Sequence, residues 1–176
     1  MKISRSTAGF TLIEMLVVVF IIGIIAAGVI LSVSLTGQDH ELQTESERIA
    51  TLMNYARDSA EMQTREMGLA CSATGYEFYA FDPRTQLWDS IPEDDALRER
   101  RLPAGLTLKL RVEGHDIVFK PVNKADSKKP DIMIFSNGDL SDFQLTVERE
   151  GATRNAKIAA NDKGHIEATP SPESTS

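Results

Sequence analysis

Hydrophobic and polar positions give the first third of the chain two different patterns. Residues 15–35 contain no charged side chain and no proline. At a helical rise of ~1.5 Å per residue, this run is long enough to cross the ~30 Å hydrocarbon core of a bilayer. From Glu41 to Glu66, apolar residues recur at spacings of three, four and seven, with charged residues on the other faces, which predicts an amphipathic helix.

No proline separates the two helical patterns. The sequence has none between Phe10 and Glu66, so we expect a single long helix whose first half spans a membrane and whose second half is amphipathic. Gly37 is the expected bend of this helix and Gly68 its expected stop.

The remainder of the chain shows the shorter patterns of β-strands, and two pairs of them are separated by a short glycine-containing turn, as in hairpins. The expected strands are Leu69–Ser72, Tyr76–Phe81, Leu106–Val112, Asp116–Pro121, Ile132–Phe135, Phe143–Arg149, Ala156–Ala159 and His165–Ala168. Residues 82–105 are expected to be irregular, apart from a short helix over Glu93–Arg100. The predicted fold class is α+β, with the long N-terminal helix packed on antiparallel β-sheet.

Composition narrows the functional classes. The formal net charge of −7 opposes general nucleic-acid binding, which needs a basic surface to replace phosphate counterions. The single cysteine, Cys71, excludes an intramolecular disulfide, and its apolar neighbours predict a buried structural role. Residues 169–176 are rich in Pro, Ser, Thr and Glu, and we expect them to form a disordered tail.

Candidate catalytic residues are sparse. His40, His115 and His165 are scattered along the sequence, and none of the HExxH, GxSxG, P-loop or CxxC motifs occurs. We therefore expect a protein that is not an enzyme and that carries no cofactor.

Two acidic segments are candidate metal sites. Residues 93–95 are three acids followed by Arg98 and Arg100, an order that complements a helix dipole, and we interpret them as a helix start. Residues 136–142 offer several oxygen atoms but only two carboxylates and lack the EF-hand order, so we expect a plain turn rather than a calcium site. No metal site is predicted.

Glu14 is the anomaly of the N-terminal region, because it lies just inside the apolar segment and follows a basic leader that contains Lys2 and Arg5. A carboxylate at the edge of a membrane segment costs free energy unless it has a partner, so Glu14 is a functional candidate; the alternative is a solvated carboxylate at headgroup depth.

A cleavable secretory signal, cut near residues 26–28, would also place basic residues before an apolar run. This run is longer than the usual ~7–15 residues of such signals, and Glu14 stands before it.

The motif around Glu14 resembles the processing site of type IV pilin-like proteins, the family of pilins and type II secretion pseudopilins. It reads Gly9-Phe10-Thr11-Leu12-Ile13-Glu14 and is followed directly by the apolar run. The resemblance implies that a membrane-embedded prepilin peptidase cleaves between Gly9 and Phe10 and methylates the new amino terminus on Phe10. It also implies that Glu14 pairs with the terminal amine of a neighbouring subunit, which fixes register during assembly.

Later segments are similar to the H-type minor pseudopilins of type II secretion. The segments are Gly75-Tyr76-Glu77-Phe78, Phe81-Asp82-Pro83 with Trp88, Leu102-Pro103-Ala104-Gly105-Leu106, and residues 130–139, and their order and spacing carry the similarity. The resemblance implies a pilin-like fold and a structural subunit of the pseudopilus, which helps to export folded proteins across the outer membrane. A minor pilin of a type IV pilus, acting in assembly, priming or DNA uptake, is the alternative.

The resemblance also implies an organisation and a set of partners. Residues 1–9 are the expected leader, 10–36 the transmembrane and fibre-core helix, 37–168 a periplasmic globular domain that includes the amphipathic helix 41–66, and 169–176 the tail. The implied location is the inner membrane, crossed once, with the globular domain in the periplasm. The implied partners are the prepilin peptidase, the major pseudopilin, minor pseudopilins of the I, J and K types, membrane lipid and other secretion components, and no nucleic acid.

Overall fold

The structure of the protein is a computed structural model that describes residues 12–119, 129–149, 151 and 154–172, with only the backbone described for residues 26–39 and 172. Gly9 and Phe10 therefore lie outside the described residues. The chain divides into two compact units, Met1–Gln38 and Asp39–Ser176.

The expected long helix is confirmed as α1, Leu12–Gln63, and Gly37 is helical within it. The predicted stop at Gly68 is wrong. Thr64, at φ 50°, takes the left-handed position that ends the helix, with Thr64 N–H donating to Glu61 O (3.2 Å) and Arg65 N–H to Ala60 O (3.1 Å). These two bonds form a Schellman motif, in which Thr64 replaces the more usual glycine.

Over the part of the chain that the structure describes, no helix combines the length and the apolar character that a membrane crossing requires.

The first sheet of the globular unit contains β1 (Met67–Ser72), β2 (Gly75–Asp82), β3 (Leu87–Ser90), β4 (Arg100–Arg101) and β7 (Ile132–Ile134). The strand order is β3-β2-β1-β7, and β4 also pairs with β2. The hairpin predicted from Leu69 to Phe81 is confirmed. The predicted helix Glu93–Arg100 is wrong, because this stretch consists of turns and bends that lead into β4.

The second sheet contains β5 (Leu106–Val112), β6 (His115–Ile117), β8 (Phe143–Arg149), β9 (Arg154–Ala160) and β10 (Ile166–Pro172), in the order β10-β9-β8-β5-β6. All pairings in both sheets are antiparallel, as expected. The expectation that disorder begins at Thr169 is corrected. Residues 169–172 form the second half of β10 and pair with Arg154–Lys157, because an extended strand accepts proline where the missing N–H faces away from its neighbour.

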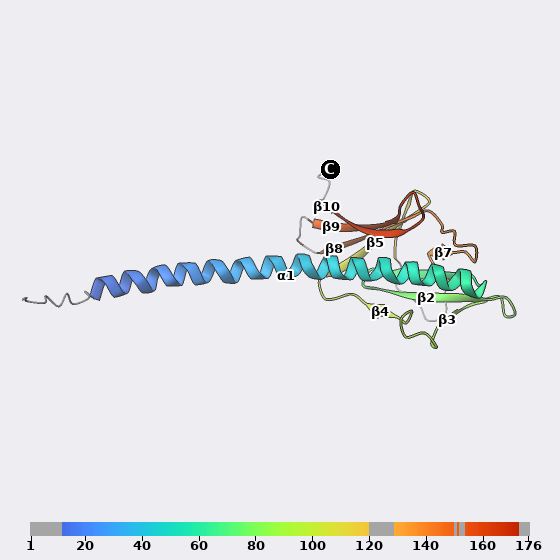
Figure 1. The fold of residues 1–176 in the computed structure, drawn as a ribbon, viewed down its shortest axis with the longest axis horizontal. Helices are drawn as coiled ribbons and strands as arrows, with labels where there is room; N and C mark the ends of the chain where they lie inside the picture. The colour runs from blue at the N-terminus through green and yellow to red at the C-terminus, as the bar shows by residue number, and fades with distance from the viewer. Residues whose placement is uncertain (1–11, 120–128, 150, 152–153, 173–176) are drawn as a thin grey trace, which may run out of the picture. The chain divides into compact units, whose positions relative to one another are not determined.

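One hydrophobic core joins the helix to both sheets. The buried face of α1 includes Ile49, Met53 and Ala56, which belong to the same cluster as Phe78 of the first sheet and Ile158 of the second. Figure 1 shows this part of α1 with β8, β9 and β10 on one side and β2, β3 and β4 on the other. The amphipathic pattern of the sequence therefore corresponds to a helix covered by two sheets.

Candidate assembly site

Glu14 lies in the first turn of α1 and is exposed. It is the only charged residue between Leu12 and Ile25, and every residue of this stretch is exposed. Large apolar side chains make up most of it; Leu12 is 84% exposed and Phe20 65% exposed. An exposed apolar surface of this kind is typical of a segment that binds lipid or another protein. A carboxylate in the first helical turn also interacts favourably with the helix dipole.

Hydrogen bonds from α1 hold the second sheet to the helix inside the globular unit. Asn54 Nδ2 donates to Ile166 O (2.8 Å), and Ile166 N–H donates to Asn54 Oδ1 (3.1 Å). Arg57 Nη1 donates to the carbonyl of Gly164, in the turn between β9 and β10. Side chains of α1 thus hold the start of β10 by its main chain, so these contacts do not depend on the side chain of Ile166.

A buried polar cluster holds the first sheet to the same helix. Glu45 is only 2% exposed, and its carboxylate receives hydrogen bonds from Arg48 Nη1 (2.6 Å) and from the hydroxyl of Tyr76 (3.3 Å). Burial raises the pKa of Tyr76 well above its usual range, and the Glu45 carboxylate adds to this shift, whereas Arg100 opposes it. Tyr76 therefore stays neutral and acts as a donor to Glu45.

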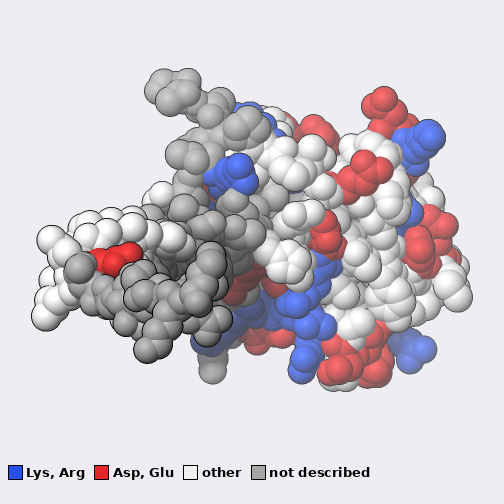
Figure 2. Space-filling view, turned by 60° about the vertical axis from the view of Figure 1, so that its left-hand side comes forward, with Lys and Arg blue, Asp and Glu red and all other residues white. Residues whose placement is uncertain are grey.

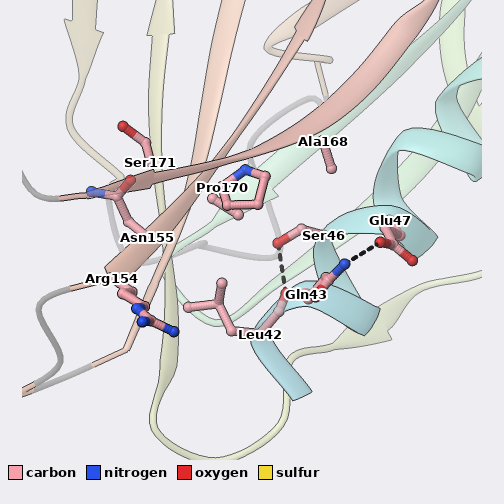
Figure 3. Close-up of a pocket in the computed structure, with 10 residues that line it drawn as sticks. Leu42, Gln43, Ser46, Glu47, Arg154, Asn155, Ala168, Pro170 and Ser171 are labelled. Atoms are coloured by element: carbon pink, nitrogen blue, oxygen red, sulfur yellow. Dashed lines mark hydrogen bonds between the residues drawn. The ribbon is translucent and has the colours of Figure 1, made fainter. Parts of the chain in front are cut away.

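A hollow of about 290 Å³ opens between α1 and the last two strands. Its apolar walls come from Leu42 on the helix, Ala156 on β9, and Ala168 and Pro170 on β10 (Figure 3). Ser46 faces the hollow with a small side chain, whose hydroxyl donates back to Leu42 O (2.7 Å).

The rim of the hollow is polar. Gln43 Nε2 donates to Glu47 Oε1 (2.8 Å) on the helix side, as Figure 3 shows, and Arg154 and Asn155 lie on the strand side. The Oδ1 atom of Asn155 is buried and has no hydrogen-bond partner in the structure. A buried acceptor without a donor costs free energy.

Charged side chains are interspersed over the face of the globular unit seen in Figure 2, with acidic and basic residues side by side. The basic residues of the segment 98–101 include Arg98, which pairs with Asp95 (3.6 Å). Another basic residue, Arg111, pairs with Asp116 (3.0 Å). In both pairs, an acidic neighbour offsets the positive charge of the arginine.

The candidate catalytic and metal-binding residues do not form a cluster. The three histidines are exposed and far apart in the sequence: His40 lies on α1, His115 on β6, and His165 just before β10. Asp94, one of the three successive acids, accepts a hydrogen bond from the hydroxyl of Tyr55 (2.9 Å). Within the described ranges, no three His, Cys, Asp or Glu residues are placed to hold a metal ion.

Two features of the site were missed from the sequence. Glu45 lies three residues after the buried Leu42 and four before the buried Ile49, so its place on the apolar face could have been found from helical spacing. The Asn54 contact joins residues 112 positions apart, and local sequence carries no signal for it.

Comparison with known proteins identifies the family. The family model described as "Type II transport protein GspH" matches residues 45–164. The chain belongs to this family. A second model, the prokaryotic N-terminal methylation motif, matches residues 4–35 and so includes Gly9, Phe10 and Glu14.

Relatives and solved structures agree with the family. The chain is 29% identical to type II secretion system protein H of Pseudomonas aeruginosa, over 90% of this chain and 92% of the relative. It is 28% identical to the protein of the same name of Aeromonas hydrophila, over 81% of each chain. The fold is similar to that of a crystal structure of the minor pseudopilin EpsH from Vibrio cholerae (14% identity, 78% of this chain, 98% of that chain, TM-score 0.63). The pilin-like fold is therefore confirmed, and the secretion interpretation is supported over the type IV pilus alternative.

Proposed function

We propose that this protein is a minor pseudopilin, a structural subunit of the type II secretion pseudopilus that helps to export folded proteins across the outer membrane. The family match over residues 45–164 is the observation that carries this proposal. The described residues offer hydrophobic and hydrogen-bonding surfaces for assembly, and the role that they support is structural rather than catalytic.

The first proposed step is processing. The prepilin peptidase cleaves between Gly9 and Phe10 and methylates the amine of Phe10. The methylation-motif match over residues 4–35 supports this step. Glycine suits the cleavage position because the absence of a side chain lets the backbone approach a protease site closely.

The second step is assembly through Glu14. Cleavage creates an ammonium group on Phe10, and we infer that Glu14 of one subunit pairs with the amine of its neighbour. The exposure of Glu14 in an otherwise apolar helical stretch supports this role. In a low-dielectric setting such a pair fixes register, because an unpaired charge is costly.

The proposed location is the inner membrane, with residues 10–36 as a single-pass anchor and fibre-core helix and the globular unit in the periplasm. Lys2 and Arg5 would remain on the cytoplasmic side. The proposed partners are the prepilin peptidase, the major pseudopilin, minor pseudopilins of the I, J and K types, and other components of the secretion system.

A deletion strain tests the function. We expect it to lose export of folded proteins to the medium and to keep twitching motility, and a plasmid copy should restore export. Loss of twitching with normal export would instead establish the pilus role.

Mass spectrometry of the mature amino terminus tests the processing. We expect an N-methylated Phe10 in the wild type, uncleaved leader in Gly9→Val, and normal cleavage in the control Ala8→Ser. A mature protein that begins beyond Ala27 would contradict the proposal, because it would indicate a secretory signal.

A further inference from the structure

The longest strand edge of the globular unit belongs to β10. Among the described strands, the edge strands β3, β4, β6 and β7 have two to four residues, whereas β10 has seven. β7 is also closed locally, since Met133 N–H donates to Ser141 Oγ (3.0 Å) and Met133 O accepts from Ser141 N–H (3.1 Å). Long open edges recruit strands from other chains, so β10 is where uncontrolled association would be expected.

The register shows which backbone groups of β10 face outward. Both the N–H and the C=O of Ile166 bond to Asn54, so they point away from β9, whereas His165 O accepts from Asn161 N–H (2.8 Å) on the opposite side. Backbone groups alternate along an antiparallel strand. The even-numbered residues of β10, from Ile166 to Pro172, therefore present their backbone groups to the outer edge.

Two of these four outward positions are prolines. Pro170 and Pro172 have no N–H to offer, and the donor of Ile166 is already bound by Asn54. Ala168 is left as the one outward residue with a free N–H, and it lies in the wall of the hollow beside α1 (Figure 3). An added strand needs donors and acceptors at every second residue, and three of the four donors are missing here.

We propose that Asn54, Pro170 and Pro172 together close the outer edge of β10 to strand addition by another chain. Asn54 occupies both backbone groups at the start of the edge, and the prolines remove the donors at its end. The subunit then associates through side-chain surfaces and α1 rather than by extending its second sheet. Subunits that are concentrated for assembly need such protection, because strand pairing uses backbone groups that every chain carries.

Restoring the donors tests the closure. In the full-length protein in detergent, Pro170→Val/Pro172→Val adds two outward N–H groups without touching Asn54. We expect the protein mass measured by light scattering to rise at least twofold from the 19.4 kDa of one chain, and the Ala168 amide to become protected in hydrogen exchange. The matched control is Thr169→Val, which also places a valine on this strand, but at a position whose N–H faces β9.

The outcomes separate cleanly. A folded double variant that keeps the wild-type mass, or one that associates without protection at Ala168, would overturn the proposal. The single variants Pro170→Val and Pro172→Val each restore one donor, so they give the same readout if the double variant does not fold.

Ala168→Pro provides the reverse test, because it removes the last free donor. We expect an unchanged mass and unchanged export by cells, since no partner uses this edge. Loss of export in a folded, stable Ala168→Pro protein would show that a strand does add here. The mass measurement is independent of the proposed secretion role, so failure of that role would not be mistaken for failure of the edge closure.

Discussion

At the scale of single residues, the segment 130–132, which leads into β7, constrains two residues of β1. A Cβ atom placed on Gly68 would lie 2.4 Å from Pro130 Cβ and 2.8 Å from Ile132 O. Three residues further along β1, the backbone N–H of Cys71 donates to Asp131 Oδ2 (2.8 Å). The same short segment therefore constrains both residues: it leaves no room for a side chain at Gly68, and it holds the backbone of Cys71 by a hydrogen bond to the Asp131 carboxylate.

Gly68→Ala should destabilise the globular unit by about 1–3 kcal/mol, because the added methyl group overpacks against a proline ring and a backbone oxygen. Urea unfolding followed by circular dichroism measures this loss. Gly68→Ala/Pro130→Gly should recover part of it, since the contacts with Pro130 Cβ and Cγ disappear while the contact with Ile132 O remains. The control is Gly23→Ala, where no atom lies within 4 Å of the new methyl group, and an equal loss there would contradict the packing argument.

Cys71 should resist alkylation in the folded protein. Cys71 is half-buried, and this desolvation raises the pKa of the thiol well above its usual range; the nearby Asp131 carboxylate adds to the shift. The reactive thiolate is therefore scarce at pH 8, and its population should increase as the pH rises.

Iodoacetamide labelling at pH 8 checks this prediction. The native protein should react at least about tenfold more slowly than the protein in urea, which is the change that a single pKa unit makes in the thiolate population. Asp131→Asn should speed the native reaction by removing the charge. Equal rates in the native and unfolded protein would mean that Cys71 is accessible.

At the scale of elements, α1 carries a carboxylate on the face that it buries. Glu45 lies beneath Tyr76 and beside Arg48, so the helix reaches the first sheet through a polar contact inside an otherwise apolar interface. A satisfied buried polar contact permits fewer alternative packings than an apolar surface does. This contact therefore favours one packing arrangement of the helix on the first sheet.

Glu45→Ala should destabilise the globular unit by about 1–3 kcal/mol, because the buried Tyr76 hydroxyl loses its acceptor. Glu47→Ala, two residues away on the exposed side of the same helix, should change stability by less than about 0.5 kcal/mol. Thermal unfolding of both variants measures the difference. Similar losses would show that helix propensity rather than the buried contact determines the effect.

Elements with a strong local pattern could be predicted from the sequence. The helix up to Gln63 and the strand Phe143–Arg149 follow their periodicity, and the latter has the predicted bounds. The helix end at Thr64 was missed because a threonine takes a position that glycine usually holds. Residues 169–172 were missed because their composition is typical of disorder, whereas pairing with β9 makes them a strand.

The candidate site, too, could be predicted from the sequence only where the signal is local. The importance of Glu14 could be inferred because a charge in an apolar run is a local anomaly. The hollow beside β10 could not be inferred, since it is formed by small residues on elements that are distant in sequence, such as Ser46 and Ala168.

At the scale of the whole molecule, two units carry different chemistry. The described apolar stretch of the first unit is exposed throughout, whereas the globular unit buries most of its described apolar residues in one core. This division matches the proposed roles, in which one unit joins the fibre and the membrane and the other is folded independently of that contact.

Glu14→Gln should abolish or strongly reduce export in cells while the globular unit keeps its wild-type protease resistance. The substitution keeps the size of the side chain and removes the charge that would meet the neighbouring amine. The neighbouring change Met15→Leu is the control and should preserve export. Wild-type export by a processed Glu14→Gln protein would mean that the ion pair is not required.

The single core has a consequence for motion. Because α1 and both sheets share one cluster, neither sheet can separate from residues 49–60 of the helix without exposing the interior of the other. Backbone amides in this part of α1 should therefore exchange with solvent only through cooperative opening of the entire globular unit. A pull on the helix would then be transmitted to the unit as a whole, and would not peel off one sheet at a time.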